Sequence, residues 1–216
     1  MLSKRLSALA SFIDKNEVIA DIGSDHALLL CQLAKEKKLK KGYAIDIKEG
    51  PLKQAKRNIA NEGLANVFTI LADGLHGLPS DVTVIVIAGM GFKSIKRILE
   101  DNWPKLEKVK YVIVQCNTQM EKFRLFLAEK QVTIEDEQWV KDYKDYSFIK
   151  FSTIKKRSYS KSEIFFGPIL LKEKPLEFIN YYRLYYQKLL EFYKIRPTKD
   201  IKDRLLLIEE NLKDFI

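Results

Sequence analysis

Residues 18–27, Val18-Ile-Ala-Asp-Ile-Gly-Ser-Asp-His-Ala27, indicate the fold most clearly, because the apolar run Val18–Ile22 leads straight into a turn around one glycine. Four more apolar runs follow, at Tyr43–Ile47, Val67–Leu71, Val82–Ala88 and Tyr111–Gln115. Most are rich in Val and Ile and lack alternation, as expected of parallel strands that helices cover on both faces. Apolar residues three or four apart predict intervening helices at Ala27–Glu36, Pro51–Asn61 and Lys93–Leu99. This alternation predicts a doubly wound α/β sheet.

The pattern changes after a predicted helix at Gln119–Lys130. Val132–Val140 and Tyr146–Ile154 favour an antiparallel hairpin that closes the edge of the sheet. Lys155–Ser158 is a charged turn, and we take it as the boundary between a domain of residues 1–157 and one of residues 158–216. Apolar stripes on both sides of Pro197 predict a helical hairpin in the second domain, resembling an antiparallel coiled coil. The stripes are Leu176, Ile179, Arg183, Tyr186, Leu190 and Tyr193, then Ile201, Leu205, Ile208, Leu212 and Phe215.

Composition excludes several classes of protein. Hydrophobic residues make up 46% of the 216, so the chain is not largely disordered, and two cysteines cannot form a disulfide framework. No apolar stretch reaches the roughly 18 to 20 residues of a membrane span. Leu2, Leu6, Leu9 and Ile13 recur at helical spacing, which favours a short amphipathic helix over a signal peptide, so we expect a cytoplasmic protein. The formal net charge of +9 favours a polyanionic partner, most often nucleic acid.

The turn after the first strand departs from the dinucleotide-binding pattern. Only Gly23 is present, and Asp25 stands where the second glycine of Gly-x-Gly is expected. A carboxylate at that point would repel the pyrophosphate of NAD or FAD, whereas a ligand that bears positive charge would tolerate it. A simpler interpretation is an ordinary turn in which Ser24 or Asp25 caps the following helix.

Polar or small residues also follow the next strands. Asp46 can accept hydrogen bonds from both ribose hydroxyls of an adenosine. Asp73 can accept from an exocyclic adenine amine, and Gly74 lets the backbone approach the ring. After the fourth strand, the small residues of Ala88–Gly91 expose their backbone. At the end of the fifth strand, Gln115 and Asn117 offer side-chain amides. Because the carboxyl ends of the strands meet at one edge of the sheet, these groups predict an adenosine-binding crevice.

This order of motifs resembles the class I S-adenosylmethionine-dependent methyltransferases. The segments Asp21-Ile-Gly-Ser-Asp-His26, Asp73-Gly-Leu75, Ile87-Ala-Gly-Met-Gly91 and Gln115 resemble more specifically the bacterial tRNA (adenine-22-N1)-methyltransferase family. The resemblance spans nearly the whole chain, including Leu2-Ser-Lys-Arg-Leu6, Phe166-Gly-Pro168 and the C-terminal hairpin. Two positions depart from the family pattern: Phe92 stands where a Gly is expected, and Cys116 where a Pro is expected. Both lie at the expected pocket for the target base.

The resemblance implies a Rossmann-like domain that binds S-adenosylmethionine, a C-terminal domain that assists tRNA recognition, and methylation of N1 of adenine 22 in tRNA. It implies no membrane partner and no metal, and it leaves the oligomeric state open, with a monomer favoured. The cofactor-binding residues would be Asp21, Gly23, Ser24, Asp25, Asp46, Ile47, Asp73, Gly74, Ala88, Gly89, Met90 and Gly91. A polar wall around the target base would consist of Asp25, His26, Gln115 and Asn117. N1 of neutral adenine has a free lone pair, so its alignment rather than an obligatory general base is the protein's task.

Most of the positive charge lies in the first part of the chain, because residues 1–160 carry +7 of the total. Candidate contacts to the RNA backbone are Lys4, Arg5, Lys35, Lys37, Lys38, Lys40, Lys41, Lys93, Lys96 and Arg97. Tyr181, Tyr182, Tyr185 and Tyr186 form an aromatic cluster around Arg183. Most of these rings would pack the hairpin, and one or two exposed rings could stack on nucleotides.

Three other functions remain open at this point. An NAD-dependent oxidoreductase has a similar topology, but Asp25 and the missing glycines oppose it. A non-catalytic RNA-binding adaptor would use the hairpin as its working surface. A small-molecule methyltransferase would account for the motifs but would leave the basic N-terminal helix and the hairpin without a role.

Overall fold

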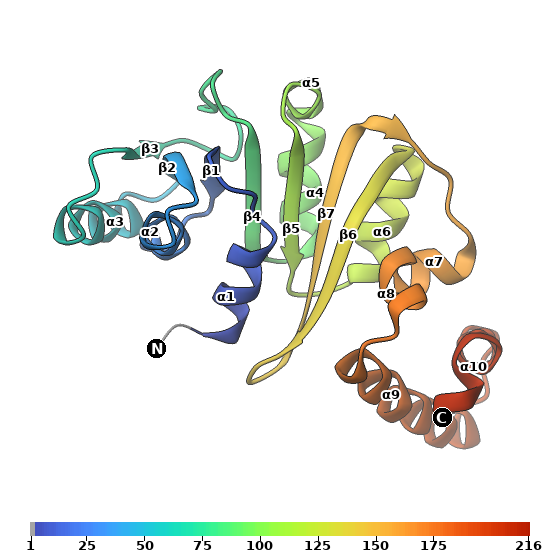
Figure 1. Cartoon of the computed structure of the whole chain (residues 1–216). Coiled ribbons are helices and arrows are strands. Elements are labelled where there is room, and N and C mark those ends of the chain that lie inside the picture. Colours follow the sequence, from blue (N-terminus) through green and yellow to red (C-terminus); the bar gives the residue numbers. More distant parts are fainter. Residues whose placement is uncertain (1–2) are drawn as a thin grey trace.

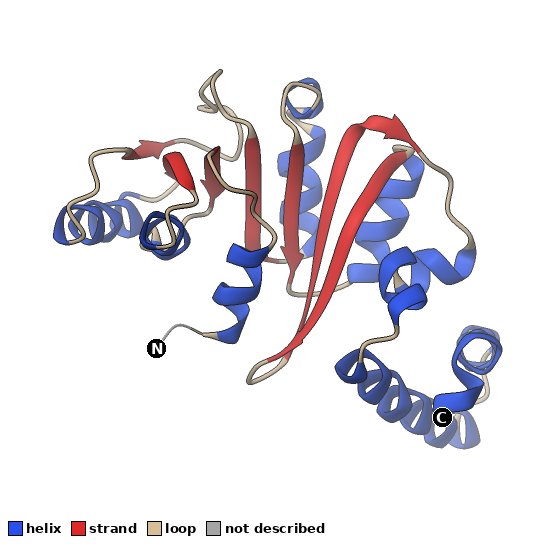
Figure 2. Ribbon diagram, viewed as in Figure 1, coloured by secondary structure: helices blue, strands red, loops and turns tan. Residues whose placement is uncertain are grey.

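A computed structural model describes residues 3–216, so Leu2 of the predicted N-terminal stripe lies outside the described residues. A seven-stranded sheet with helices on both faces forms its centre (Figure 1; Figure 2). The strands are β1 Glu17–Ile22, β2 Leu39–Asp46, β3 Val67–Leu71, β4 Val84–Met90, β5 Tyr111–Cys116, β6 Val132–Lys141 and β7 Asp145–Lys156. The helices are α1 Lys4–Ser11, α2 Leu28–Lys35, α3 Glu49–Asn61, α4 Phe92–Glu100, α5 Trp103–Leu106, α6 Met120–Glu129, α7 Lys161–Phe166, α8 Pro168–Glu173, α9 Leu176–Ile195 and α10 Lys199–Leu212, followed by the 3-10 turn η1 Lys213–Phe215.

The strand order β3-β2-β1-β4-β5-β7-β6 places β1 and β4 side by side. Strands β1 to β5 pair in parallel, whereas β7 pairs antiparallel with both β5 and β6. The chain winds outward from β1 in one direction and from β4 in the other, which confirms the doubly wound sheet and the edge hairpin predicted from the sequence. The carboxyl ends of β1 and β4 therefore meet at the switch point, where ligands bind in sheets of this kind.

The observed boundaries lie close to most of the predicted ones. Strand β2 is an exception, because it begins at Leu39, four residues before the predicted start, where Leu39 pairs with Glu17 of β1. Strand β4 begins at Val84 and continues to Met90 through a register irregularity after Ala88. Pro51 is the third residue of α3 rather than the first, and it still lies in the first turn, where an N–H has no helical partner.

Two apolar layers hold the helices against the sheet. On one face α1, α2 and α3 pack through side chains such as Leu9, Leu30 and Ile59. On the other face α4, α5 and α6 pack through side chains such as Ile95 and Phe123. Full burial of one such Leu, Ile or Phe side chain contributes about 1.5–3 kcal/mol, so the two layers fix the ends of the strands in place.

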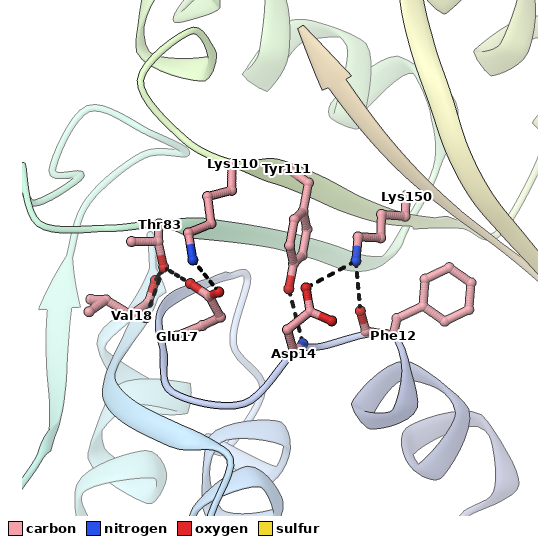
Figure 3. Close-up of polar contacts among 8 residues, drawn as sticks. All are labelled: Phe12, Asp14, Glu17, Val18, Thr83, Lys110, Tyr111 and Lys150. Atoms are coloured by element: carbon pink, nitrogen blue, oxygen red, sulfur yellow. Dashed lines mark hydrogen bonds and ion pairs between the residues drawn. The ribbon is translucent and has the colours of Figure 1, made fainter. Parts of the chain in front are cut away.

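A group of polar contacts closes the amino end of the sheet (Figure 3). The Glu17 carboxylate is 4% exposed and accepts hydrogen bonds from Lys110 Nζ and Thr83 Oγ1. The hydroxyl of Tyr111 accepts a hydrogen bond from the backbone N–H of Asp14 at 3.1 Å. Each of these buried polar groups has a partner within the protein, which is typical of contacts that serve stability.

The segment Phe166-Gly-Pro168 attaches the C-terminal helices to the sheet. Gly167 has φ = 99°, and a Cβ at this position would overlap the carboxylate of Glu137 on β6. That carboxylate is 1% exposed, pairs with Arg124 Nε of α6 at 2.8 Å, and accepts a hydrogen bond from Ile169 N at 3.0 Å. Only a glycine allows α7 and α8 to approach this buried ion pair so closely.

The predicted apolar stripe of α9 is wrong in part. Leu176 is 69% exposed, and Arg183 is also exposed and donates a hydrogen bond to Phe215 O at 2.7 Å. The buried side chains of α9 are Phe178, Ile179, Tyr182 and Leu189. Periodicity did not reveal this face, because α9 packs on α7 and on β6 as well as on α10.

The apolar stripe of α10 is confirmed, because Leu205, Ile208 and Leu212 are buried in the same cluster as the inner face of α9. In Figure 1 α9 lies toward the end of the sheet where β5 ends, as do α1 and the β6–β7 turn. A coiled-coil geometry for the pair and the division at residues 157 and 158 stay predictions. Within residues 3–216, no helix is both long enough and apolar enough to span a membrane.

Candidate active site

Two cavities adjoin at the carboxyl ends of the central strands. The first, which we call the β2–β3 cavity, has a volume of about 380 Å³ and is lined by residues that include Asp46, Ile47 and Asp73. The second, the α1–β7 cavity, has about 390 Å³ and is lined from α1, β4 and the β6–β7 hairpin. Gly23, Asp25 and Met90 line both cavities. The cavities therefore meet at the glycine turn that follows β1.

The turn after β1 brings the backbone close to Met90. Gly23 has φ = 69°, its N–H donates to Ile45 O at 2.8 Å, and a Cβ here would overlap Met90 Cε. The Ser24 hydroxyl donates to Asp21 Oδ2 at 2.6 Å inside the turn. Burial raises the pKa of Asp21 from 3.8 to about 6, although the hydrogen bond from Ser24 opposes this rise.

Neither Ser24 nor Asp25 caps the following helix, so the simpler interpretation of the turn is wrong. Helix α2 begins after Ala27, which has φ = 56° and offers no side-chain cap. His26 is also left-handed, with φ = 65°, so two consecutive residues other than glycine hold a strained conformation in this turn. The Asp25 side chain is 81% exposed and pairs with His26 Nε2 at 2.8 Å. Its carboxylate is thus available at the boundary of the cavities.

In the β2–β3 cavity, Asp46 and Asp73 occupy the ends of neighbouring strands. Asp46 Oδ1 accepts a hydrogen bond from Lys48 N at 2.8 Å. Asp73 binds the Arg97 guanidinium through both oxygens, at 2.9 and 3.0 Å, and this hydrogen bonding holds the pKa of Asp73 below its usual range. Arg97 also lines the cavity, and its assignment as a contact to RNA phosphate stays a prediction.

Gln115 organises the α1–β7 cavity without lining it. Its buried side chain accepts hydrogen bonds at Oε1 from Arg5 Nη1 and Gly89 N, both at 3.1 Å, and donates from Nε2 to Asn117 Oδ1 at 3.0 Å. Asn117 Nδ2 in turn donates to Gly89 O at 2.6 Å. These contacts hold the Gly89 backbone, Asn117 and Arg5 in one fixed arrangement.

The structure brings most of the predicted site residues to the two cavities. Four of them line neither cavity: Ser24, His26, Gly91 and Gln115. Ser24 and Gln115 instead bind side chains that do line the α1–β7 cavity, and Gly91 precedes α4 as its N-cap. Phe92 and Cys116, the two departures from the family pattern, also line neither cavity.

Sequence reasoning missed two groups of cavity residues. Arg5 was predicted only as a contact to RNA phosphate, but it lines the α1–β7 cavity and donates a hydrogen bond to Gln115. Tyr143, Lys144 and Tyr146 of the β6–β7 hairpin also line this cavity, and no motif pointed to them. The only signal was aromatic residues beside the hairpin turn. Within residues 3–216, no group of three or more His, Cys, Asp or Glu side chains is arranged to hold a metal ion.

Comparisons with known proteins agree with this geometry. A family described as tRNA (adenine(22)-N(1))-methyltransferase matches residues 19–215. The tRNA (adenine(22)-N(1))-methyltransferase of Bacillus subtilis strain 168 is 36% identical over 138 residues, which cover 63% of this chain and 58%, less than two thirds, of that relative. The solved structure of M. capricolum TrmK with S-adenosyl-homocysteine has a TM-score of 0.87 at 29% identity and covers 100% of both chains. The B. subtilis M1A22 tRNA methyltransferase TrmK has a TM-score of 0.80 at 29% identity, covering 100% of this chain and 99% of that one.

Proposed function

This chain belongs to the tRNA (adenine(22)-N(1))-methyltransferase family, and on that premise we propose that it transfers a methyl group from S-adenosylmethionine to N1 of adenine 22 in tRNA. One observation carries the proposal: two cavities adjoin at the switch point of the sheet and share Gly23, Asp25 and Met90. A reaction between a nucleotide cofactor and a second base needs two such sites in contact. Neither an NAD-dependent oxidoreductase nor an adaptor accounts for the acid at their boundary as directly.

The residues of the β2–β3 cavity fit an adenosine. Asp46 keeps Oδ2 free for ribose hydroxyls, and Asp73 keeps lone pairs beyond those that bind Arg97. Gly74 has φ = 56° and lines the cavity, and a Cβ here would lie only 3.1 Å from the Ile98 side chain, so this close approach favours a glycine. The volume of about 380 Å³ lies in the range of small-molecule sites. Asp25 at the cavity boundary is placed to attract a sulfonium cation.

The chemistry then depends on alignment. When bound, S-adenosylmethionine supplies a methyl group activated by its sulfonium charge. Asp46 and Asp73 would hold the cofactor so that this methyl group could pass to the lone pair of adenine N1 as its C–S bond breaks, and the positive charge would pass to the base. Asp25 would stabilise positive charge at both ends of this transfer. Arg5, Gln115 and Asn117 would hold the Gly89 backbone as one rigid wall of the base pocket.

Binding of tRNA would use the basic residues that are not already paired. Several candidates form ion pairs within the protein: Lys35, Lys38, Lys41, Lys96 and Arg97. Among the described residues, the side chains of Lys4 and Lys93 form no ion pair, and both stand near the site, at the beginnings of α1 and α4. The target base must leave its stack to reach the α1–β7 cavity.

The division of labour between the two parts of the chain belongs to the same proposal. Residues 1–157 would form the cofactor-binding domain, and residues 158–216 would recognise the shape of the tRNA. The whole chain would act as a monomer. The separate apolar cluster of α7 to α10 supports this division. The buried Arg124–Glu137 ion pair lies within residues 1–157 and reaches across the division by hydrogen bonds, because Glu137 accepts one from Ile169 N and Arg124 donates one to Phe165 O, so the C-terminal helices are held in a defined position.

The deciding experiment is reaction of the full chain with S-adenosylmethionine and unmodified tRNA, followed by mapping of the modified nucleoside by mass spectrometry. We expect one 1-methyladenosine, at position 22. Binding of tRNA without methyl transfer would identify an adaptor instead. A shift in melting temperature with NAD, and none with S-adenosylmethionine, would indicate the oxidoreductase.

A further inference from the structure

Tyr146 has a buried hydroxyl without a partner. It lies on β7, with 2% of its surface exposed, in the apolar layer that also contains α1. Its Oη is the one buried side-chain oxygen or nitrogen among residues 3–216 that makes no hydrogen bond. A buried hydroxyl without a partner loses the hydrogen bonds that water would give it, so such groups are rare unless a ligand completes them.

The hydroxyl belongs to a residue that lines the α1–β7 cavity and not the β2–β3 cavity. Two cations lie close to its ring, because Arg5 Cζ is 5.7 Å and Lys144 Nζ is 5.1 Å from its centroid. Tyr143, which is 78% exposed, meets the same ring edge to face at 5.5 Å. Contacts on several sides thus hold Tyr146 in position for a ligand inside this cavity.

Adenine offers three acceptor nitrogens in its rings, namely N1, N3 and N7. N1 must keep its lone pair free for the methyl group, so a hydrogen-bond donor is useful only at N3 or N7. A tyrosine hydroxyl keeps its proton at neutral pH and can donate it, and burial together with the neighbouring Tyr143 raises the pKa of Tyr146 further, to about 12. The acid near the methyl group, Asp25, lines both cavities, whereas Tyr146 lies only in the second and would meet a different edge of the base.

We propose that the Tyr146 hydroxyl donates a hydrogen bond to a ring nitrogen of the target adenine other than N1. This bond would fix the in-plane orientation of the base and direct N1 toward the methyl group. The proposal rests on the function proposed above and adds a residue that positions the base.

The first test compares Tyr146→Phe with Tyr111→Phe, a control on the neighbouring strand whose hydroxyl has a partner at the opposite end of the sheet. We expect Tyr146→Phe to lower kcat/KM for tRNA about tenfold, the effect of one lost hydrogen bond, without lowering the melting temperature. Its Kd for S-adenosylmethionine should stay unchanged. Tyr111→Phe should do the opposite, lowering the melting temperature and leaving kcat/KM unchanged. Equal loss of melting temperature in both variants, with methyl transfer unchanged, would overturn the proposal.

The second test removes the acceptor instead of the donor. Synthetic tRNA with 3-deazaadenosine or 7-deazaadenosine at position 22 is methylated by the wild type and by Tyr146→Phe. On one of these substrates we expect the wild type to lose its tenfold advantage over the variant, which identifies the nitrogen that accepts the bond. If the wild type keeps its tenfold advantage over Tyr146→Phe on both substrates, the inference is overturned. Methylation of these substrates by the wild type would still support the proposed function. No methylation of any tRNA by the wild type would overturn the proposed function itself.

Discussion

Strand β1 carries a buried carboxyl group near each end, and the protein treats the two groups differently. Glu17, at the amino end, accepts hydrogen bonds from Lys110 and Thr83. Asp21, toward the carboxyl end, has a single hydrogen-bond donor, the Ser24 hydroxyl. Both groups are less than a tenth exposed. The same strand thus buries one acid with an ion-pair partner and another without one.

The contrast extends to the two ends of the sheet. At the amino end the polar groups satisfy one another (Figure 3). At the carboxyl end the buried hydroxyl of Tyr146 has no partner. An unmet hydrogen bond costs stability, so it persists where a ligand completes it. The amino end serves stability, and the carboxyl end serves binding.

The largest predicted effect is on the stability of Asp21→Asn. The folded-state pKa of about 6 lies above the ordinary value of 3.8, so the folded protein binds more protons between these values. The contribution of Asp21 to stability is therefore greatest below pH 3.8 and is lost as the pH rises through 6, by up to about 3 kcal/mol at two pKa units. Asn cannot ionise, so urea unfolding at pH 8 should show Asp21→Asn to be more stable than the wild type, with most of this gain absent at pH 4.5.

Glu17→Gln is the matched variant at the other end of β1. It removes the charged acceptor of Lys110 and Thr83, so we expect a loss of about 1–3 kcal/mol at pH 8 in the same unfolding measurement. Binding of S-adenosylmethionine should weaken in Asp21→Asn and stay unchanged in Glu17→Gln. If both variants lose stability at pH 8, the two ends of the strand do not differ as we describe.

The sequence predicted the layers of the fold because each layer follows from a local period. Buried parallel strands need apolar runs, and their covering helices need stripes, so β1, β3 and β5 were found within one residue of their ends. Helical spacing of apolar residues did not predict the buried face of α9 correctly, because Leu176 is exposed and Phe178 is buried. That helix packs on α7, β6 and α10 at once, so its buried side chains do not lie on one stripe at helical spacing.

The candidate site was predictable where it follows strand ends and not where it depends on tertiary contacts. Gly23, Asp46 and Asp73 follow strands, and topology alone places them at one edge. Arg5 and Tyr146 come from α1 and from β7, and only the packing of α1 over the hairpin brings them to one cavity. Gln115 was predicted as a wall of the base pocket, yet its amide binds Arg5, Gly89 and Asn117. Spacing in the sequence carries no information on such partners.

The next largest predicted effect is on the rate of methyl transfer, and it concerns Asp25, which lines both cavities. Asp25→Ala should lower methyl transfer at least tenfold, because the carboxylate would no longer stabilise positive charge near the methyl group. The melting temperature should hardly change, since the side chain is 81% exposed. Single-turnover assays with saturating tRNA measure this step directly.

Asp81→Ala is the control for that variant at the amino end. Asp81 pairs with Lys41 at 2.8 Å and accepts a hydrogen bond from Tyr43 at 2.9 Å. Its loss should cost at most about 1 kcal/mol of stability and leave methyl transfer unchanged. A rate for Asp25→Ala equal to that of Asp81→Ala would remove Asp25 from the site.

The smallest predicted effect tests the same contrast on two lysines that the sequence could not tell apart. Lys93 is the second residue of α4, at the carboxyl end of the sheet, and Lys40 lies near the start of β2 at the amino end. Both side chains are exposed, and neither forms an ion pair among the described residues. Lys93→Ala should weaken tRNA binding about twofold to threefold and reduce the slope of log K against log salt by about 0.7–0.9, as expected for one phosphate contact. Lys40→Ala should change neither value in binding titrations at several salt concentrations. Equal losses in both variants would mean that tRNA is attracted by the net charge of +9 as a whole and not by the end of the sheet that holds the site.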